Sequence, residues 1–166
     1  MMRTTLAALF SMFLLTAITP AEAQVSCKDP AYRQFDFWLG EWEVRKPDGT
    51  LAGTNRIEKQ YGGCVLHEHY STPSGYSGES LNTYDVTRKL WHQTWVDNTG
   101  LLLLLDGRLV DGRMVLEGPG QDAKGVAIRH RISWTPNPDG TVRQFWESTD
   151  ASGKWTVAFD GTYKRK

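Results

Sequence analysis

Hydrophobic and polar residues alternate with a period of two along most of the chain, the pattern of a β-strand with one buried face. In residues 126–135, for example, Ile132 and Trp134 fall on one face, and Arg129 and Arg131 fall on the other. Segments of this kind recur along the chain. We predict strands at residues 42–45, 52–60, 64–71, 79–86, 90–96, 101–110, 113–117, 126–135, 142–149 and 155–163.

Turn residues separate these segments at intervals typical of sandwiches and barrels. Glycine beside Asp, Asn or Pro favours tight hairpin turns. Such signals stand at residues 47–49, 62–63, 74–75, 97–100, 111–112, 119–120, 137–140 and 151–153. Asp106-Gly107 and Asp160-Gly161 fall inside strand patterns, so we expect bulges there. The predicted fold class is all-β: a single antiparallel up-and-down β-barrel of about ten strands, whose first and last strands pair.

A short N-terminal helical plug precedes the first predicted strand. Residues 29–39 favour a helix because Asp29 can cap it, Pro30 fits its first turn and Gly40 fits its end. The sequence Phe-Asp-Phe-Trp at 35–38 makes this segment aromatic. We expect it to close one end of the barrel.

Residues 1–23 have the features of a cleaved signal peptide. Arg3 supplies a positive start, an apolar run covers residues 6–18, and Ala21-Glu22-Ala23 is a small-x-small cleavage site. The apolar run is too short to span a bilayer comfortably. We expect cleavage before Gln24, one β-barrel domain at residues 24–166, a periplasmic or secreted location, and no stable membrane span after cleavage.

Charge and cysteine content narrow the choice of partners. The 19 basic and 19 acidic residues cancel, and no basic stripe appears, so we expect no nucleic-acid partner. Cys27 and Cys64 both lie in the predicted exported part. An even cysteine count in an oxidising compartment predicts a disulfide. Two free thiols in a redox or metal site are the alternative, which the absence of Cys-x-x-Cys spacing disfavours.

Gly40-Glu41-Trp42 resembles the Gly-x-Trp opening of the calycins, the group of lipocalins and fatty-acid-binding proteins. A longer pattern is similar to a family of exported bacterial proteins of unknown function. It comprises residues 35–44 (FDFWLGEWEV), 63–68, 80–85, 91–97 and 143–147. The resemblance implies a calycin-like barrel without implying an activity. It also implies that Trp42 packs across the closed end, where Lys164 or Arg165 covers it by a cation–π contact.

One departure from the calycins bears on ligands. Residues 46–50, between the first two predicted strands, are too few for the two-helix lid of a fatty-acid-binding protein. A lidless ten-strand barrel also resembles the nitrobindin type, which holds haem through one histidine. The glycine-rich opening of that type has no counterpart here beyond Gly40-x-Trp42. We therefore predict no cofactor and no metal, with haem kept as a minor alternative.

Aromatic and amide side chains make a candidate ligand pocket. Trp91, Gln93 and Trp95 share one face of a predicted strand. Other strands could present further residues to the same interior, namely Asn82, Tyr84, Arg143 and Trp146. Ligand cavities join apolar walls to a few fixed polar groups. We predict that the chain binds a small hydrophobic or amphipathic molecule, with indoles as walls and polar groups as orienting contacts.

Glu68 and Glu147 are the candidate acid–base groups. A carboxylate surrounded by tryptophans is desolvated, which raises its pKa and suits it to proton transfer. The alternative is that each pairs with Arg129, Arg131 or Arg143 on the barrel wall. No nucleophile elbow, zinc-protease motif, phosphate loop or dinucleotide fingerprint occurs. A barrel isomerase, lyase or hydrolase is thus one alternative to a binding protein.

His67 and His69 lie two residues apart, so they face the same side of a strand about 7 Å apart at Cα. This spacing can support a metal site with a third ligand, for which His92 or His130 is a candidate. Glu68 lies between them and faces the other way. If Glu68 points inward, both histidines point outward.

The leucine run Leu101–Leu105 allows two interpretations. It is either a strand buried on both faces or an exposed patch for self-association. A barrel strand normally has one polar face, which favours the patch and a homo-oligomer. A structural or interaction module of the cell envelope, with a solid barrel interior, is therefore the second alternative.

Overall fold

Each strand pairs with its sequence neighbours, and the last strand returns to the first to close the sheet. This is a computed structural model, and it describes residues 27–166, so the predicted signal peptide lies outside the described residues. The described residues form one closed antiparallel barrel in the order β1-β10-β9-β8-β7-β6-β5-β4-β3-β2. Its strands are β1 (Gly40–Arg45), β2 (Leu51–Gln60), β3 (Val65–Ser71), β4 (Ser77–Asp85), β5 (Leu90–Asp97), β6 (Leu102–Val110), β7 (Arg113–Gln121), β8 (Ala127–Pro136), β9 (Val142–Thr149) and β10 (Trp155–Arg165).

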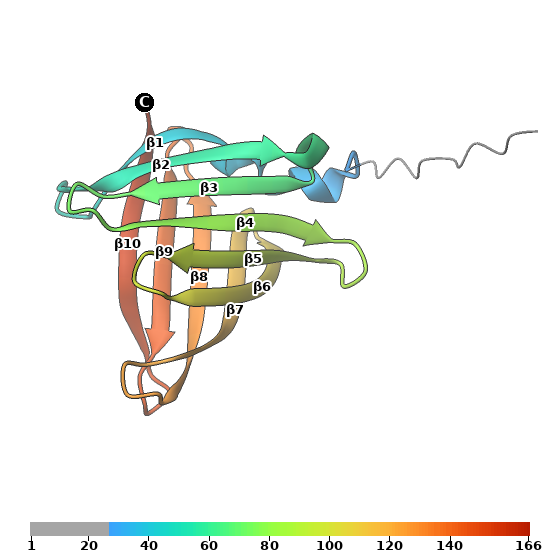
Figure 1. The fold of residues 1–166 in the computed structure, drawn as a ribbon. Coiled ribbons are helices and arrows are strands. Elements are labelled where there is room, and N and C mark those ends of the chain that lie inside the picture. The colour runs from blue at the N-terminus through green and yellow to red at the C-terminus, as the bar shows by residue number, and fades with distance from the viewer. Residues whose placement is uncertain (1–26) are drawn as a thin grey trace, which may run out of the picture.

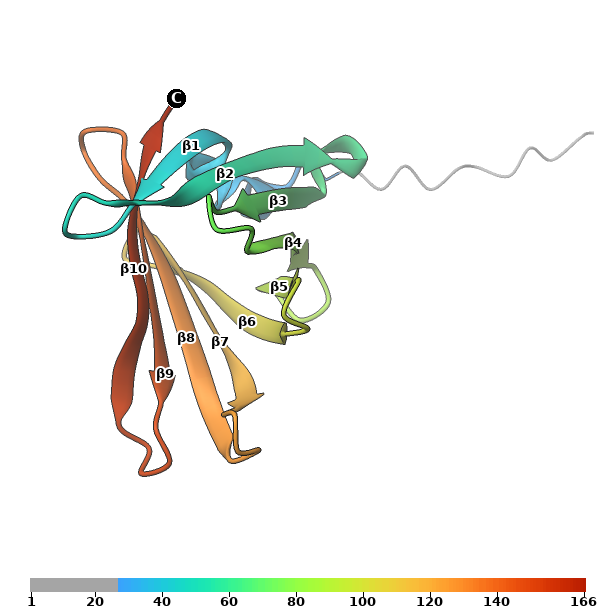
Figure 2. The same ribbon diagram turned by 60° about the vertical axis from the view of Figure 1, so that its left-hand side comes forward.

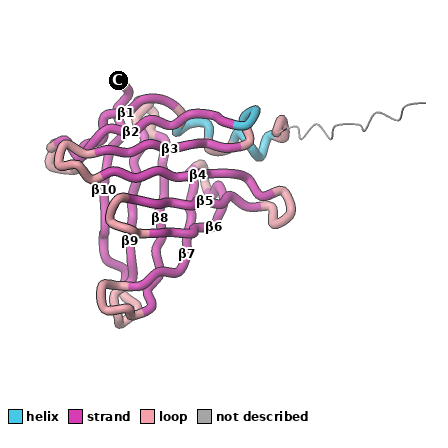
Figure 3. Tube along the Cα trace, viewed as in Figure 1, coloured by secondary structure: helices cyan, strands magenta, loops and turns pink. Residues whose placement is uncertain are grey.

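This architecture confirms the predicted all-β, up-and-down barrel. Closure is direct, because Trp42 in β1 pairs with Arg165 in β10, and Val44 pairs with Tyr163. Strands β2 to β5 cross strands β8 to β10 at a steep angle, so the barrel is flared rather than cylindrical (Figures 1 and 2). Loops gather at the strand ends, and the short helices lie together beside one of those ends (Figure 3).

The plug consists of two short 3₁₀ helices instead of the predicted single helix. They are η1 (Pro30–Arg33) and η2 (Asp36–Trp38). The predicted Asp29 cap is present, with its Oδ1 accepting from the backbone N–H of Ala31 at 2.8 Å. The prediction of one continuous helix is wrong, because the chain leaves helical geometry at Phe35, between the two short helices. Phe35 and Trp38 are both fully buried.

Aromatic stacking fills the closed end of the barrel. Phe35 stacks on Trp38 with ring centroids 4.9 Å apart. Phe35 also meets Trp91 and Trp134 edge-on, at 5.6 and 5.2 Å. Trp42 Nε1 donates to the Trp38 carbonyl oxygen at 2.9 Å. Plug and barrel wall therefore form one continuous core.

The covering contact on Trp42 is made by Arg165. Its guanidinium carbon lies 4.4 Å from the centroid of the Trp42 ring, while the neighbouring Lys164 is exposed. The cation–π contact implied by the resemblance is therefore present, with Arg165 as the cation.

The predicted disulfide joins the plug to the wall. Cys27 is bonded to Cys64, 37 residues later, beside the short helix η3 (Tyr61–Gly63). Arg33 reinforces the junction by donating to the Gly63 carbonyl at 2.5 Å and to the Cys27 carbonyl at 3.2 Å. The bond confirms the pairing and excludes a site made of two free thiols. Among residues 27–166, no helix is long and apolar enough to cross a bilayer.

The predicted bulges at Asp106-Gly107 and Asp160-Gly161 are wrong. Gly107 and Gly161 are in regular register with Leu116 and Gln144. They serve close approach instead, because a Cβ on Gly107 would collide with the backbone of β7 and one on Gly161 with the Phe159 ring.

The register of β10 against β9 shifts at Ala158 instead. Val157 faces Glu147 and Phe159 faces Trp146, with Ala158 left over between them. This bulge reverses the predicted alternation, because one extra residue exchanges the two faces of a strand. Trp155 and Val157 were expected on the same face as Phe159, but Val157 is exposed. Trp155 instead carries the Arg131 guanidinium over its ring.

The predicted turn at Pro119-Gly120 is also wrong. Strand β7 continues to Gln121, and Pro119 is in register with Arg129 of β8. The β6–β7 register ends earlier, at Glu117. Proline is tolerated where a strand is paired on one side, so the chain turns only after Asp122, whose carbonyl accepts from Gly125 N–H.

Candidate functional site

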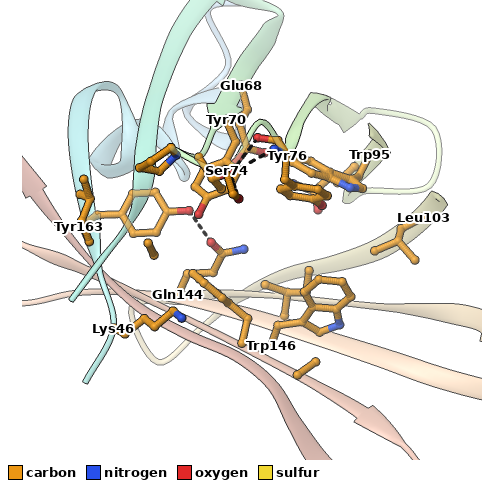
Figure 4. A pocket seen from close by; sticks show the side chains of 18 residues that line it. Lys46, Glu68, Tyr70, Ser74, Tyr76, Trp95, Leu103, Gln144, Trp146 and Tyr163 are labelled. Carbon is orange, nitrogen blue, oxygen red and sulfur yellow. Dashed lines mark hydrogen bonds between the residues drawn. The ribbon is translucent and has the colours of Figure 1, made fainter. Parts of the chain in front are cut away.

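A cavity of about 540 Å³ occupies the half of the barrel that the plug leaves empty. This volume is typical of small-molecule sites. The β1–β2 hairpin contributes Lys46 and Leu51 to its border, and the β3–β4 hairpin contributes residues 72–74. Its aromatic lining is Tyr70, Tyr76, Trp95, Trp146, Phe159 and Tyr163. Figure 4 shows the labelled side chains arranged around an open space, with Glu68 at the top of the view and Trp146 below.

A chain of hydrogen bonds separates this cavity from the aromatic plug. Asn55 Nδ2 links two strands by donating to Glu68 Oε1 at 2.7 Å and to Tyr163 Oη at 3.2 Å. The Tyr163 hydroxyl donates in turn to Gln144 Oε1, a contact drawn in Figure 4. On the other side, Ser80 Oγ donates to Glu68 Oε2 at 2.5 Å. Glu68 is therefore held from both sides.

The chain continues beyond Ser80 into β5. Asn82 Nδ2 donates to Ser80 Oγ at 2.8 Å. Gln93 Nε2 donates to Asn82 Oδ1 at 2.8 Å. Buried polar groups that satisfy one another in this way fix a single arrangement of side chains. One acceptor is left over: among the described residues, Asn55 Oδ1 is buried with no hydrogen-bond partner.

Glu68 is the carboxyl group that lines the cavity. It is 3% exposed, and burial raises its pKa from 4.5 to about 7, although the hydrogen bonds from Ser80 and Asn55 act in the opposite direction. Each carboxylate oxygen has lone-pair capacity for more than one donor. Glu68 can therefore accept a further hydrogen bond from a guest, or exchange a proton with it near neutral pH.

Two tyrosines beside Glu68 stay protonated. Burial, followed by the nearby Glu68 charge, raises the pKa of Tyr70 to about 12. The same two causes raise the pKa of Tyr163 well above its usual value. Both hydroxyl groups are therefore neutral donors or acceptors at any physiological pH.

Asp97 fixes two aromatic rings of the cavity wall. Its Oδ2 accepts from the Tyr76 hydroxyl at 2.8 Å and from Trp95 Nε1 at 3.2 Å. Burial alone would raise the pKa of Asp97, but hydrogen bonds from Thr99, Tyr76 and Trp95 lower it to about 2. The carboxylate is thus permanently charged and holds both rings in place.

Some of the residues predicted for the pocket line this cavity together. They are Gln93, Trp95 and Trp146, along with the weaker candidate Glu68. Asn82 is fully buried beneath them and reaches Gln93 and Ser80 by hydrogen bonds. Its place is in the support of the pocket and not on its surface.

Two predicted aromatic residues belong to the closed end. Trp91 Nε1 donates to Gln34 Oε1 at 3.2 Å, and the ring packs on Phe35. Tyr84 meets Trp91 and Tyr32 of η1 edge-on. Trp91 shares a strand face with Trp95, but the plug covers it. Period-two alternation identifies which side chains point inward without telling how deep each lies.

Two predicted charged residues lie outside the barrel. Arg143 forms a two-pronged ion pair with Asp160, at 2.8 Å for both bonds. Glu147 accepts from Arg131 at 2.9 Å, directly across the β8–β9 register. Glu147 therefore does not reach the cavity as an acid–base group, because Trp146 lines the cavity and its sequence neighbour faces away. It makes the alternative contact instead, an ion pair with Arg131 on the barrel wall.

Several residues of the polar chain were not predicted, namely Asn55, Ser80, Gln144 and Tyr163. Asn55 lies two residues from Ile57, on the apolar face of its strand. Ser80 stands two residues before Asn82. A polar residue on an otherwise inward-facing series is a readable signal, since burying it requires a partner. Gln144 and Tyr163 meet only through the β9–β10 register.

The alternation around Glu68 predicts that the two histidines beside it face the opposite side of the strand, and the structure agrees. His67 and His69 point outward, and each lies within hydrogen-bond distance of Glu79. The two candidate third ligands lie elsewhere: His92 bonds to Asp106. His130 faces inward, where its Nδ1 accepts from Trp146 Nε1 at 3.1 Å and burial lowers its pKa.

The leucine run divides between core and surface. Leu103 and Leu105 are buried, while Leu102 and Leu104 are exposed. The strand thus follows ordinary alternation, with an apolar outer face in place of a polar one. The structural-module alternative predicts a solid barrel interior, and the cavity contradicts that prediction.

Comparison with known proteins adds no family to this description. No protein-family model matches the chain, and a search of curated proteins found no match. The cavity and the groups that line it are therefore the basis for assigning a function.

Proposed function

We propose that this protein binds a small, mostly apolar molecule inside the open half of its barrel. The observation that carries the proposal is the cavity of about 540 Å³, whose walls are rings held by wall contacts such as Asp97 on Trp95 and Tyr76. Burying apolar ligand surface against such walls contributes about 25 cal/mol per Å². Rigid walls add to affinity because little side-chain freedom is lost on binding.

The polar chain specifies what the ligand carries at its inner end. Glu68 lines the cavity, and its carboxylate oxygens have capacity for a further hydrogen bond beyond those from Asn55 and Ser80. A carboxylate at one end of an apolar cavity favours a guest with a hydrogen-bond donor, such as a hydroxyl or an amine. The ligand class that fits is therefore amphipathic: an apolar body with a donor group at one end.

A fluorescence titration with N-phenyl-1-naphthylamine tests the binding proposal, because this uncharged probe brightens in apolar sites. We expect saturable binding to the wild type and at least a severalfold weaker binding to Trp95→Ala. Trp155→Ala is the matched control, since Trp155 packs under Arg131 on the outer wall. Unsaturable fluorescence in the wild type, or equal weakening in both variants, contradicts the proposal.

The position of Glu68 supports acid–base catalysis as a second candidate. A group with a pKa of about 7 in an enclosed cavity is suited to accept and return a proton at neutral pH. The discriminating variant is Glu68→Gln. A catalytic role predicts loss of turnover with N-phenyl-1-naphthylamine binding retained, whereas a purely binding role predicts altered selectivity between donor-bearing and donor-free ligands.

We further propose export, self-association through the outer leucines, and kinship with the exported family sharing the FDFWLGEWEV opening. The Cys27–Cys64 disulfide is consistent with an oxidising compartment. Mass spectrometry of the mature chain tests export, with an N-terminus at Gln24 as the expected result.

Sedimentation of Leu104→Lys beside the wild type tests self-association, since Leu104 is exposed. A monomeric wild type contradicts the proposed self-association.

A further inference from the structure

The outer face of β3 carries two histidines that converge on one carboxylate. His67 and His69 flank the inward-facing Glu68, and their ring centroids lie 3.9 Å apart. In the neighbouring strand β4, Glu79 is in register with His69. Its Oε2 lies 2.9 Å from His67 Nε2, and its Oε1 lies 3.1 Å from His69 Nδ1. The three ligand atoms all fall within 4.8 Å of one another.

These separations match the edges of a metal coordination shell. Zinc binds imidazole nitrogen and carboxylate oxygen at roughly 2.0–2.2 Å in a tetrahedron, which places adjacent ligands about 3.3 Å apart. The two measured nitrogen–oxygen distances need to grow by only a few tenths of an ångström to admit an ion. Two imidazoles with one carboxylate favour Zn²⁺, Cu²⁺ or Ni²⁺ over Mg²⁺ and Ca²⁺, which prefer oxygen ligands.

We propose that His67, His69 and Glu79 form a site for one divalent transition-metal ion on the outer wall of the barrel, with solvent completing the coordination. Strands of one rigid sheet supply all three ligands, so little ordering is needed on binding. The site lies on the opposite face of β3 from Glu68, and it therefore does not depend on the proposed ligand cavity.

Gln60 is placed to orient one of the ligands. Its side-chain amide nitrogen lies 2.9 Å from His67 Nδ1. Metal-binding histidines donate their other ring N–H to an oxygen in the outer shell. A half-turn of the Gln60 amide exchanges its nitrogen for its oxygen, which then accepts from Nδ1–H while Nε2 holds the ion. Gln60 is thus a positioning residue.

The charges around the site are compatible with a cation. On β2, Glu58 is in register with His67, and Arg56 is in register with His69. Arg56 and Glu58 form an ion pair, so their charges largely cancel. Glu79 supplies the net negative charge of the site.

Isothermal titration of the untagged protein with Zn²⁺ tests this site, with Mg²⁺ as the comparison ion. We expect one Zn²⁺ per chain and no heat from Mg²⁺. Glu79→Gln and His69→Gln should each weaken Zn²⁺ binding at least tenfold, and Gln60→Ala about tenfold, as outer-shell losses typically do. The ligands are partly exposed, so these variants should keep the wild-type circular dichroism spectrum.

His92→Gln is the matched control. His92 also lies half-exposed beside a carboxylate, with Nδ1 2.7 Å from Asp106 Oδ1, but it has Thr94 on its other side in place of a second histidine. We expect its Zn²⁺ affinity to equal that of the wild type. Absence of Zn²⁺ binding to the wild type, or the same weakening in His92→Gln as in Glu79→Gln, would overturn the proposal. Unchanged binding in Glu68→Gln would confirm that site and cavity are separate.

Discussion

The two halves of this barrel are built from the same strands, yet one is solid and the other hollow. At the closed end, Phe35 and Trp38 descend from the plug and pack against Trp134 of the wall. At the open end, Trp95 and Trp146 face the cavity, and no segment of residues 27–166 is inserted between them. Inward-facing aromatics therefore do not by themselves determine whether a barrel is filled. The decisive element is the segment that enters it.

The boundary between the halves is polar. The chain from Gln144 through Tyr163, Asn55 and Glu68 to Ser80 crosses the interior where the plug stops. Each of these buried hydrogen bonds brings a desolvation cost, because its groups give up contacts with water. Packing alone would not require such groups at this level of the barrel. The layer both supports the plug and presents polar groups to the cavity, which is how one structure serves stability on one side and recognition on the other.

The largest expected difference is between a plug-side and a cavity-side tryptophan. Trp42→Ala removes a fully buried ring and should lower the free energy of unfolding by about 3–5 kcal/mol. Trp95→Ala enlarges a space that is already open and should cost about 1 kcal/mol. Urea denaturation followed by circular dichroism measures both. Equal losses would mean that the two halves are packed alike.

The next effect concerns pH and the polar boundary. Because the pKa of Glu68 is raised from 4.5 to about 7 in the folded state, the folded protein binds more protons than the unfolded chain between these values. Stability should therefore fall as pH rises from below about 4.5 to above about 7, by about 3 kcal/mol in total. In Glu68→Gln this fall should disappear.

Denaturation of both proteins at pH 5 and pH 8 measures the difference. The variant should be less stable than, or equal to, the wild type at pH 5 and more stable at pH 8, since an amide there replaces a buried charge. Asn55 and Ser80 remain to bond with the new side chain. A parallel pH dependence in the two proteins would contradict a boundary carboxylate that titrates near neutrality.

The smallest expected effect belongs to the cover of the closed end. Arg165→Gln removes the cation over the Trp42 ring and should cost about 0.5–1 kcal/mol. Lys164→Gln is the control, because Lys164 is exposed and makes no contact of this kind among the described residues. The same loss in both variants would assign the effect to net charge and not to the stacked geometry.

Much of the barrel can be predicted from sequence because alternation and turn chemistry are local. The face of Glu68 decides the faces of His67 and His69, and the structure agrees with that geometry. The bulge at Ala158 could not be found in this way, since Asp160-Gly161 is the stronger local signal.

The depth of each inward-facing side chain within the barrel also could not be predicted from the sequence. Trp91 and Trp95 share a face, but the plug covers one and leaves the other in the cavity. The same holds for contacts set by strand register. The Asn55–Tyr163 hydrogen bond joins residues 108 positions apart. Neither segment contains a local sequence signal that predicts the other as its partner. Predicting the pocket therefore requires the three-dimensional path of the plug.

The most direct test of a filled half and a receptive half uses all seven tryptophans at once. Fluorine NMR of protein labelled with 5-fluorotryptophan, titrated with N-phenyl-1-naphthylamine, reports each indole separately once single variants assign the signals. We predict that the fluorine signals of Trp95 and Trp146 shift on addition of the probe. Little change is expected in the signals of the other five tryptophans, which are Trp38, Trp42, Trp91, Trp134 and Trp155. Shifts confined to Trp155, or shared by the plug indoles, would contradict a ligand site in the open half.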